Sequence, residues 1–284
     1  MDVIQRSTDY LSKKGVDSPR LQIELLLAHQ LKLRRLQLYL NFDRVLTAGD
    51  LEALRAFVTR RGERVPLQHL VGSVSFCGME LGVGPEVLIP RPETELLAER
   101  AVKWLGERKD AGATGLRALD YGTGSGCLAL WIASKCDSVE VHALDISAAA
   151  LERAKDNARR NSLDSRVTFH EGDGLSSWDP GLTLDLLISN PPYIPTEEIS
   201  SLEPEVRDFD PRQALDGGPD GLTFYRRLAS EASEFVRPGG LLLLELGDGQ
   251  GDSVRALLST EKWVVEAILP DYSARPRVLV AHRH

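Results

Sequence analysis

The spacing of hydrophobic residues predicts helices at the start of the chain. Residues 17–31 (DSPRLQIELLLAHQL) and 47–66 (TAGDLEALRAFVTRRGERVP) both carry leucines at helical intervals, which is typical of amphipathic helices. Asp17 is expected to cap the first helix, with Pro19 in its first turn. The expected apolar faces consist of Leu21, Leu25, Leu26 and Leu27 in the first helix and of Leu51, Leu54 and Val58 in the second. A small helical bundle is therefore predicted.

A different pattern begins near residue 73. Residues 73–90 form short apolar pieces broken by Gly and Pro, which predicts a β-hairpin. Strand-like runs follow at 116–122, 139–147, 166–172, 184–190, 240–247, 263–270 and 276–283, with helix-like stretches such as 127–136 and 148–161 between several of them. This alternation predicts an α/β fold with a parallel sheet covered on both faces. We expect a helical domain at 1–72, a β-hairpin linker at 73–90 and an α/β domain at 91–284.

Composition and charge narrow the class of protein. The chain is 42% hydrophobic and 27% charged, as in ordinary globular proteins. It has no apolar run near the roughly 18 residues of a membrane span and no secretory signal at its start, so we expect a cytoplasmic protein. Its three cysteines lack metal-site or disulfide spacing. Residues 1–75 carry a net charge of +4 and the remainder −12, which argues against a long duplex nucleic acid as substrate.

A glycine-rich loop follows the strand expected at 116–122. Asp120 comes before Gly122, Thr123, Gly124, Ser125 and Gly126, and a helix-like stretch comes after them. Alternate glycines let backbone approach a ligand closely, and a helix N-terminus offers free N–H groups. The spacing is GxGxG, not the GxGxxG of dinucleotide sites, so the loop alone identifies no ligand.

Acidic residues end the next two expected strands. Asp145 ends the second strand, where an acid typically binds ribose hydroxyls in α/β sheets. Asp173 follows the third strand, where it could accept a hydrogen bond from an adenine amino group. Each acid alone is explained equally well as a helix cap or a solvated loop residue. Together with Asp120 and the glycine loop, at successive strand ends, they predict a ligand that contains adenosine.

The fourth expected strand ends in Asn190-Pro191-Pro192-Tyr193, on the same edge of the sheet. Prolines are ordinary strand terminators, but this position suggests chemistry. An amide or adenine amino nitrogen is a poor nucleophile because its lone pair is delocalised. The Asn190 side-chain oxygen and the Pro191 carbonyl can accept hydrogen bonds from such a nitrogen, and Tyr193 offers a flat face to pack against it. Neither proline carries a competing N–H donor.

Together, these motifs resemble class I S-adenosylmethionine-dependent methyltransferases, which have a Rossmann-like fold with a mostly parallel seven-stranded sheet. The last tetrapeptide resembles the (D/N)PP(Y/F) signature of enzymes that methylate planar NH₂ nitrogens. Over nearly its full length the chain is similar to the HemK/PrmC family of release-factor glutamine N5-methyltransferases. The similarity includes the end of the helical domain (residues 60–76), LIPRPETE (88–95), ALDGGPDGL (214–222) and LLLLELG (241–247).

The resemblance implies a reaction and its participants. A methyl group of S-adenosyl-L-methionine would pass to the side-chain N5 of the glutamine in the GGQ motif of class 1 peptide chain release factors, leaving S-adenosyl-L-homocysteine. These release factors are the expected partners, and the N-terminal domain is expected to recognise them. Neither a membrane, a metal nor a direct nucleic acid substrate is expected.

The resemblance also assigns roles by position. Gly122 to Gly126 would line the methionine and ribose part of the cofactor, Asp145 and Ile146 would bind ribose, and Asp173 and Gly174 would lie beside adenine. Residues 190–193 would hold the glutamine, with Asn190 also at the cofactor. Members of that family can carry an aromatic residue where Gly174 stands, so any stacking on adenine must come from elsewhere. Arg91 and Glu93 would lie near the site or simply begin a helix, and residues 196–211 would cover the substrate or form a surface loop.

Two other functions fit part of the pattern. A nucleic-acid adenine-N6 methyltransferase uses the same tetrapeptide, although the acidic α/β domain and the absence of an evident base-reading domain argue against it. The other is a methyltransferase-like scaffold that has kept the fold but lost the activity. The intact glycine loop, Asp145 and the tetrapeptide argue against such a loss.

Overall fold

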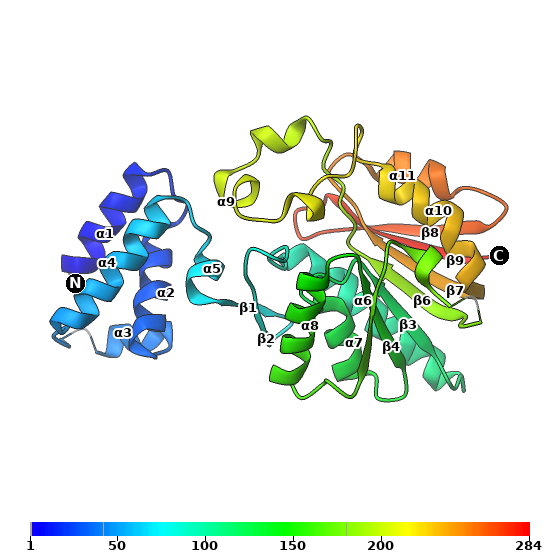
Figure 1. The fold of residues 1–284 in the computed structure, drawn as a ribbon, viewed down its shortest axis with the longest axis horizontal. Coiled ribbons are helices and arrows are strands. Elements are labelled where there is room, and N and C mark those ends of the chain that lie inside the picture. Colours follow the sequence, from blue (N-terminus) through cyan, green and yellow to red (C-terminus); the bar gives the residue numbers. More distant parts are fainter. Residues whose placement is uncertain (1, 42, 180) are drawn as a thin grey trace. The chain divides into compact units, whose positions relative to one another are not determined.

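The computed structural model describes residues 2–41, 43–179 and 181–284, and its internal contacts divide the chain into two units. The smaller unit comprises the residues through Ser73 together with Leu202–Phe209, and the larger comprises Val74–Ser201 and Asp210–His284 (Figure 1). Each unit has its own hydrophobic core.

The smaller unit is helical. Its elements are α1 (Asp2–Lys13), α2 (Pro19–Leu31), α3 (Arg35–Leu40), α4 (Ala48–Gly62), α5 (Leu67–Val71) and α9 (Pro204–Arg207). The core includes Leu11, Ile23, Leu26, Leu27, Leu54 and Val58, with Phe209 packed against it. Thr47 caps α4 by accepting a hydrogen bond from the backbone N–H of Asp50. The predicted bundle is thus confirmed, and it recruits one segment from far along the chain.

Three predictions for these helices are wrong: that Leu21 of α2 and Leu51 of α4 are buried, and that Asp17 caps α2. Leu21 and Leu51 are 38% and 41% exposed, while Ile23 is fully buried. Two positions along a helix turn it by about 200°, so Leu21 faces away from the stripe that contains Ile23. Asp17 does not cap α2; Ser18 occupies the cap position in a left-handed conformation and makes no side-chain cap hydrogen bond.

The larger unit is built on a seven-stranded sheet of order β5-β4-β3-β6-β7-β9-β8. The strands are β3 (Arg117–Tyr121), β4 (Glu140–Asp145), β5 (Val167–Glu171), β6 (Leu184–Ser189), β7 (Val236–Glu245), β8 (Trp263–Pro270) and β9 (Pro276–Arg283). The first five pair in parallel, while β9 pairs antiparallel with β7 and β8. This confirms the mostly parallel sheet.

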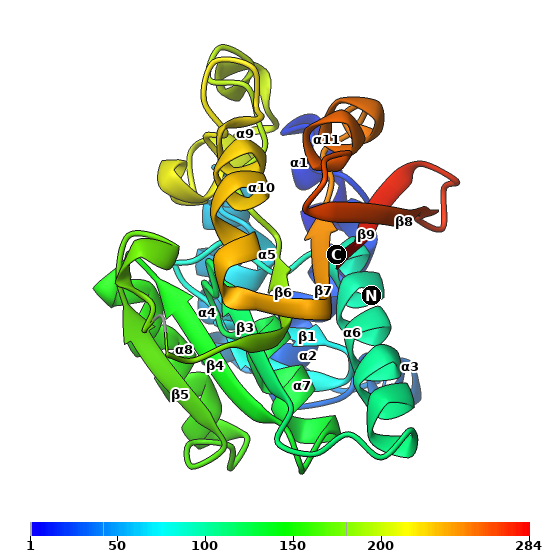
Figure 2. The same ribbon diagram turned by 90° about the vertical axis from the view of Figure 1, so that its right-hand side faces the viewer.

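Helices cover both faces of this sheet, because alternate residues of each strand point to opposite sides. Ala118 and Leu186 face the core under α6 (Pro92–Asp110), α7 (Cys127–Lys135) and α8 (Ala148–Arg160). Leu119 and Leu187 face the other core, under α10 (Thr223–Phe235) and α11 (Gly251–Leu258) (Figure 2). Short 3₁₀ turns lie at Leu175–Ser177, Glu198–Ser201 and Arg212–Ala214.

The hairpin of β1 (Ser73–Phe76) and β2 (Met79–Gly82) belongs largely to the larger unit. Asn157 of α8 binds both the N–H and the carbonyl of Gly82, at 2.6 and 3.0 Å. Glu95 of α6 accepts a hydrogen bond from the N–H of Cys77 at 2.9 Å. These bonds attach the predicted hairpin to α6 and α8, which cover the same face of the sheet.

Candidate active site

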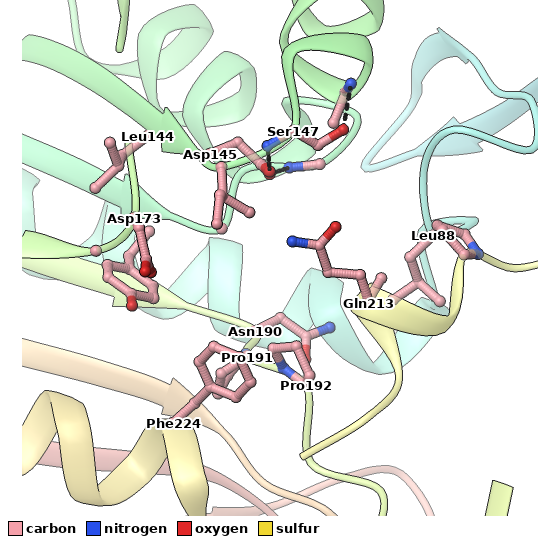
Figure 3. A pocket seen from close by; sticks show the side chains of 18 of the residues that line it. Leu88, Leu144, Asp145, Ser147, Asp173, Asn190, Pro191, Pro192, Gln213 and Phe224 are labelled. Carbon is pink, nitrogen blue, oxygen red and sulfur yellow. Dashed lines mark hydrogen bonds between the residues drawn. The ribbon is translucent and has the colours of Figure 1, made fainter. Parts of the chain in front are cut away.

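A cavity of about 290 Å³ lies at the edge where β3, β4, β5 and β6 end. Parallel strands bring their carboxyl ends to one edge, which is where α/β sheets bind ligands. Nine of the residues singled out from the sequence line it: Gly122, Gly124, Asp145, Ile146, Asp173, Gly174, Asn190, Pro191 and Pro192 (Figure 3). Thr123, Ser125, Gly126 and Tyr193 are not among its lining residues.

The glycine loop presents bare backbone to this cavity. Gly122 and Gly124 have φ of 73° and 52°, and a Cβ on either would meet no atom within 4 Å. Gly126 serves packing instead, since its Cβ would lie 3.1 Å from that of Ala154. Thr123 and Ser125 are buried. The loop therefore combines an open inner surface at its first two glycines with a packed base.

Asp120 supports the loop from beneath. It is 1% exposed and does not line the cavity. One carboxylate oxygen accepts hydrogen bonds from the Thr123 hydroxyl at 2.6 Å and from the Ala129 N–H at 3.1 Å. Burial raises the pKa of Asp120 to about 7, although these two hydrogen bonds lower it. Asp120 thus holds the start of α7 against the loop.

Asp145 connects the loop to the end of β4. Its two carboxylate oxygens accept hydrogen bonds from the N–H groups of Gly124, at 2.8 Å, and Ser147, at 2.9 Å (Figure 3). An ionised carboxylate has about four lone-pair positions, so acceptor capacity remains on the cavity side. Burial raises the pKa of Asp145, and the hydrogen bonds from these N–H groups oppose that shift.

Arg227 of α10 lies over the loop that follows β5. Its guanidinium binds the Asp173 carboxylate and the Asp173 carbonyl, both at 2.6 Å. A Cβ on Gly174 would lie 2.3 Å from Arg227 Nη2, and the φ of Gly174 is +75°. The guanidinium therefore occupies the space into which a side chain at 174 would grow. Arg227 and Phe224 both line the cavity at this end of α10.

The Asn190–Tyr193 segment lines the cavity with its first three residues. Asn190 donates a hydrogen bond from Nδ2 to the Thr94 hydroxyl at 3.2 Å. The Tyr193 ring packs close to Gly247, and its carbonyl accepts a hydrogen bond from Gln250 Nε2 at 2.9 Å. Burial, and then the nearby Glu245 charge, raise the pKa of Tyr193 to about 12. The aromatic residues that line the cavity are Tyr121 and Phe224.

Arg91 and Glu93 lie at the start of α6. Arg91 is the N-cap residue, and Glu93 is in the first turn, where an acid interacts favourably with the helix dipole. Arg91 forms an ion pair of 2.6 Å with Asp210, which also accepts a longer hydrogen bond from the Ile89 N–H. Burial raises the pKa of Asp210 to about 6, although Arg91 lowers it. Neither Arg91 nor Glu93 lines the cavity.

The sequence did not single out several lining residues. Leu88 lies within the motif at 88–95, and Gln213 lies between the segment at 196–211 and the motif at 214–222, so their neighbourhoods were indicated. Phe224 and Arg227 lie beyond these segments. Figure 3 shows the side chain of Gln213 reaching into the cavity from the turn at residues 212–214. The contributions of Phe224 and Arg227 depend on tertiary folding and leave no local pattern.

Among the described residues, no three or more His, Cys, Asp and Glu side chains are grouped so as to hold a metal ion. In the same part of the chain, every helix is too short or too polar to cross a membrane.

Comparison with known proteins gives consistent matches along the chain. Residues 2–72 match the PrmC N-terminal domain family and residues 101–202 match the methyltransferase small domain family. The chain is 43% identical to a release factor glutamine methyltransferase of Geobacter sulfurreducens over 259 residues, covering 90% of this chain and 87% of that one. It is 40% identical to the enzyme of that name from Chlorobaculum tepidum over 282 residues, covering 98% and 95%.

A solved structure, that of a methyltransferase from Pyrococcus furiosus, matches the fold with a TM-score of 0.50 at 20% identity, covering 73% of this chain and 89% of that one. The full-length similarity to the two curated relatives goes further than the fold. This chain belongs to the family of release factor glutamine methyltransferases.

Proposed function

We propose that this protein methylates the side-chain N5 of the glutamine in the GGQ motif of class 1 release factors, in the cytoplasm, with S-adenosyl-L-methionine as methyl donor. The observation that carries the proposal is one cavity lined by the glycine loop, by Asp145 and by the Asn190–Pro192 segment. The family relationship supports the same reaction.

The residues around the cavity suit the cofactor. Gly122 and Gly124 leave open space beside their backbone, where the methionine and ribose parts can approach. Asp145 has acceptor capacity for ribose hydroxyls, and Asp173 lies where the adenine amino group can bind. When bound here, S-adenosylmethionine would supply a methyl group on a positively charged sulfur; the glutamine amide nitrogen would form the new C–N bond and lose a proton as the C–S bond breaks, leaving neutral S-adenosyl-L-homocysteine.

The Asn190–Pro192 segment is proposed to hold the glutamine amide. The Asn190 side-chain oxygen and the Pro191 carbonyl accept hydrogen bonds from its two N–H groups. These contacts favour a nitrogen that is becoming tetrahedral, so they strengthen as the reaction proceeds and lower the barrier. The fixed φ of the prolines keeps both acceptors in place, and holding the nitrogen in line with the methyl group supplies a further part of the rate.

The segments of the chain are proposed to have separate roles in recognition, linkage and catalysis. Residues 1–72 would recognise the release factor, residues 73–90 would link the domains, and residues 91–284 would catalyse. The end of the smaller unit at Ser73 supports the first boundary. The net charge of −12 beyond residue 75 supports a protein substrate rather than a nucleic acid, because phosphate contacts require basic surfaces.

The test is the intact mass of an unmodified class 1 release factor after incubation with this protein and S-adenosylmethionine, beside duplex DNA and rRNA. We expect a gain of one methyl group, located on the GGQ glutamine. Transfer to nucleic acid alone would favour the adenine-N6 reaction. No transfer to any substrate, with the cofactor still bound, would indicate an inactive scaffold.

Two variants separate the proposed roles. Asn190→Ala should abolish transfer while cofactor affinity stays nearly unchanged, because it removes a substrate acceptor. Asp145→Ala should weaken cofactor affinity by about 10- to 100-fold, because it removes hydrogen bonds to a charged group. Asp164→Ala is the control, since Asp164 is exposed and outside the cavity. Unchanged cofactor affinity in Asp145→Ala would contradict the ribose assignment.

A further inference from the structure

Three residues from distant parts of the chain form a hydrogen-bonded row that ends in the cavity. Asn190, just after β6, donates from Nδ2 to the hydroxyl of Thr94 at 3.2 Å. Thr94, in the first turn of α6, donates from the same hydroxyl to Glu245 Oε2 at 2.7 Å. Glu245 is the last residue of β7. Thr94 is the fourth residue of the RPETE run (91–95), so that run reaches the Asn190 side chain without itself lining the cavity.

The row has a direction because a hydroxyl carries one proton. Thr94 and Glu245 are 2% and 1% exposed, so solvent does not replace either partner. While Glu245 is ionised, it can only accept, and it takes the Thr94 proton in a charge-assisted hydrogen bond. The Thr94 oxygen can then only accept from Asn190. The group of Asn190 that faces Thr94 must therefore be its NH₂, which leaves its oxygen as the free end of the amide.

The orientation of this amide matters for the reaction. A glutamine nitrogen presents N–H donors, so it needs an acceptor from Asn190. If the Asn190 amide turned over, its NH₂ would face the substrate NH₂, and donors left unpaired in a desolvated site carry a large cost. An isolated asparagine has no intrinsic preference between the two orientations that would prevent this.

We infer that Thr94 and Glu245 are positioning residues that hold the Asn190 oxygen toward the substrate nitrogen. This inference rests on the proposed role of Asn190 in binding the glutamine amide. It gives the RPETE run a function through Thr94, in addition to the helix start made by Arg91 and Pro92.

The test uses Thr94→Val, which keeps the shape of the side chain and removes the hydroxyl, with Thr94→Ser as the matched variant that keeps it. Transfer to the release factor and cofactor affinity are measured for each. We expect kcat to fall by about 10- to 100-fold in Thr94→Val, the usual effect of losing one buried hydrogen-bond partner. Cofactor affinity should stay unchanged, and Thr94→Ser should recover most of the rate.

A double-mutant cycle separates orientation from folding. Aspartate is the other residue of the (D/N)PP(Y/F) signature, and its two carboxylate oxygens are equivalent, so Asn190→Asp has no amide to orient. Thr94→Val should therefore cost little further rate when added to Asn190→Asp, giving a strongly non-additive cycle. An unchanged kcat in Thr94→Val, a parallel loss of cofactor affinity, or an additive cycle would each overturn the inference. Failure of the wild-type protein to methylate the release factor would instead overturn the proposed function itself.

Discussion

Asp120 and Asp145 illustrate how neighbouring groups, more than residue type, determine the task of a side chain. Both are aspartates at the ends of adjacent parallel strands. Asp120 is enclosed, and one of its oxygens finds no partner among the described residues. Asp145 accepts one backbone N–H at each oxygen and still faces the cavity. The first therefore supports the loop, and the second is free to bind a ligand.

Glu245 should give the reaction a pH dependence. Burial raises its pKa to about 7; Thr94, Arg277 and Arg91 oppose this shift and Glu93 adds to it. Above pH 7 the ionised carboxylate can only accept, so the Asn190 amide is held; below it the protonated acid can also donate to Thr94, and the constraint is lost. We expect kcat to rise with pH through about 7, measured as release-factor methylation at saturating cofactor.

The contribution of Glu245 to folding stability should fall as pH rises, whereas kcat should rise. Because the folded pKa of Glu245 is raised above its ordinary value of 4.5, the folded state retains a proton that the unfolded state loses between about pH 4.5 and 7. The contribution of this group to stability is therefore complete below that range and is lost across it as pH rises.

Glu245→Gln is the control for the predicted pH dependence of kcat, and it should flatten the kcat profile. Asp120 titrates in the same range, but its effect should appear in cofactor affinity; a kcat profile unchanged in Glu245→Gln would contradict the assignment to Glu245.

At the scale of elements, the strands and their ends were the predictable part. Strand-like runs located all seven strands of the sheet within a few residues. The signal is strongest in the central strands such as β6, because a strand buried on both faces is apolar almost continuously, whereas the edge strands β5 and β8 are partly exposed. The nine predicted cavity residues follow from those strand ends. Arg227 and Phe224 could not be predicted, because their approach to the cavity depends on how α10 packs on β7, to which no local pattern corresponds.

Arg227 provides a test of this contribution from α10. Its guanidinium lies over Gly174 and lines the cavity, and we propose that it stacks on adenine by a cation–π contact. Arg227→Met should weaken cofactor affinity by about 2- to 30-fold, the range of such contacts, as measured by calorimetry. The neighbouring Arg226→Met is the control, since Arg226 is exposed and pairs with Asp220 outside the cavity. Equal affinities of the two variants would show that Arg227 does not contact the cofactor.

At the scale of the whole chain, the segment after the tetrapeptide returns to the N-terminal unit. Residues 202–209 belong to the smaller unit, although residues on both sides of them belong to the larger. Glu205 binds Arg61 Nη2 at 2.6 Å and two nitrogens of Arg64 at 2.5 and 2.7 Å. Phe209 packs against the helical core. The chain that leaves Asn190–Tyr193 is thereby tied to the domain proposed to recognise the release factor.

This tie depends on a buried charge. The Arg61 side chain is 4% exposed, and that of Glu205 19%. Glu205→Gln should destabilise the smaller unit by about 3–5 kcal/mol, because removing one partner leaves a buried cation without its counter-charge. Glu203→Gln is the matched control: Glu203 also pairs with Arg64, but its side chain is 74% exposed, so the loss should be about 0–1 kcal/mol. Thermal unfolding and hydrogen exchange of residues 202–209 would measure both.

The same pair of variants connects this segment to substrate binding. If residues 202–209 hold the chain after the tetrapeptide in place, Glu205→Gln should raise the KM for the release factor and leave cofactor affinity unchanged, because Glu205 does not line the cavity. Glu203→Gln should change neither. Faster exchange of residues 202–209 without a change in KM would show that the segment stabilises the helical unit but takes no part in presenting the substrate. A simultaneous loss of cofactor affinity would mean that the damage extends into the sheet.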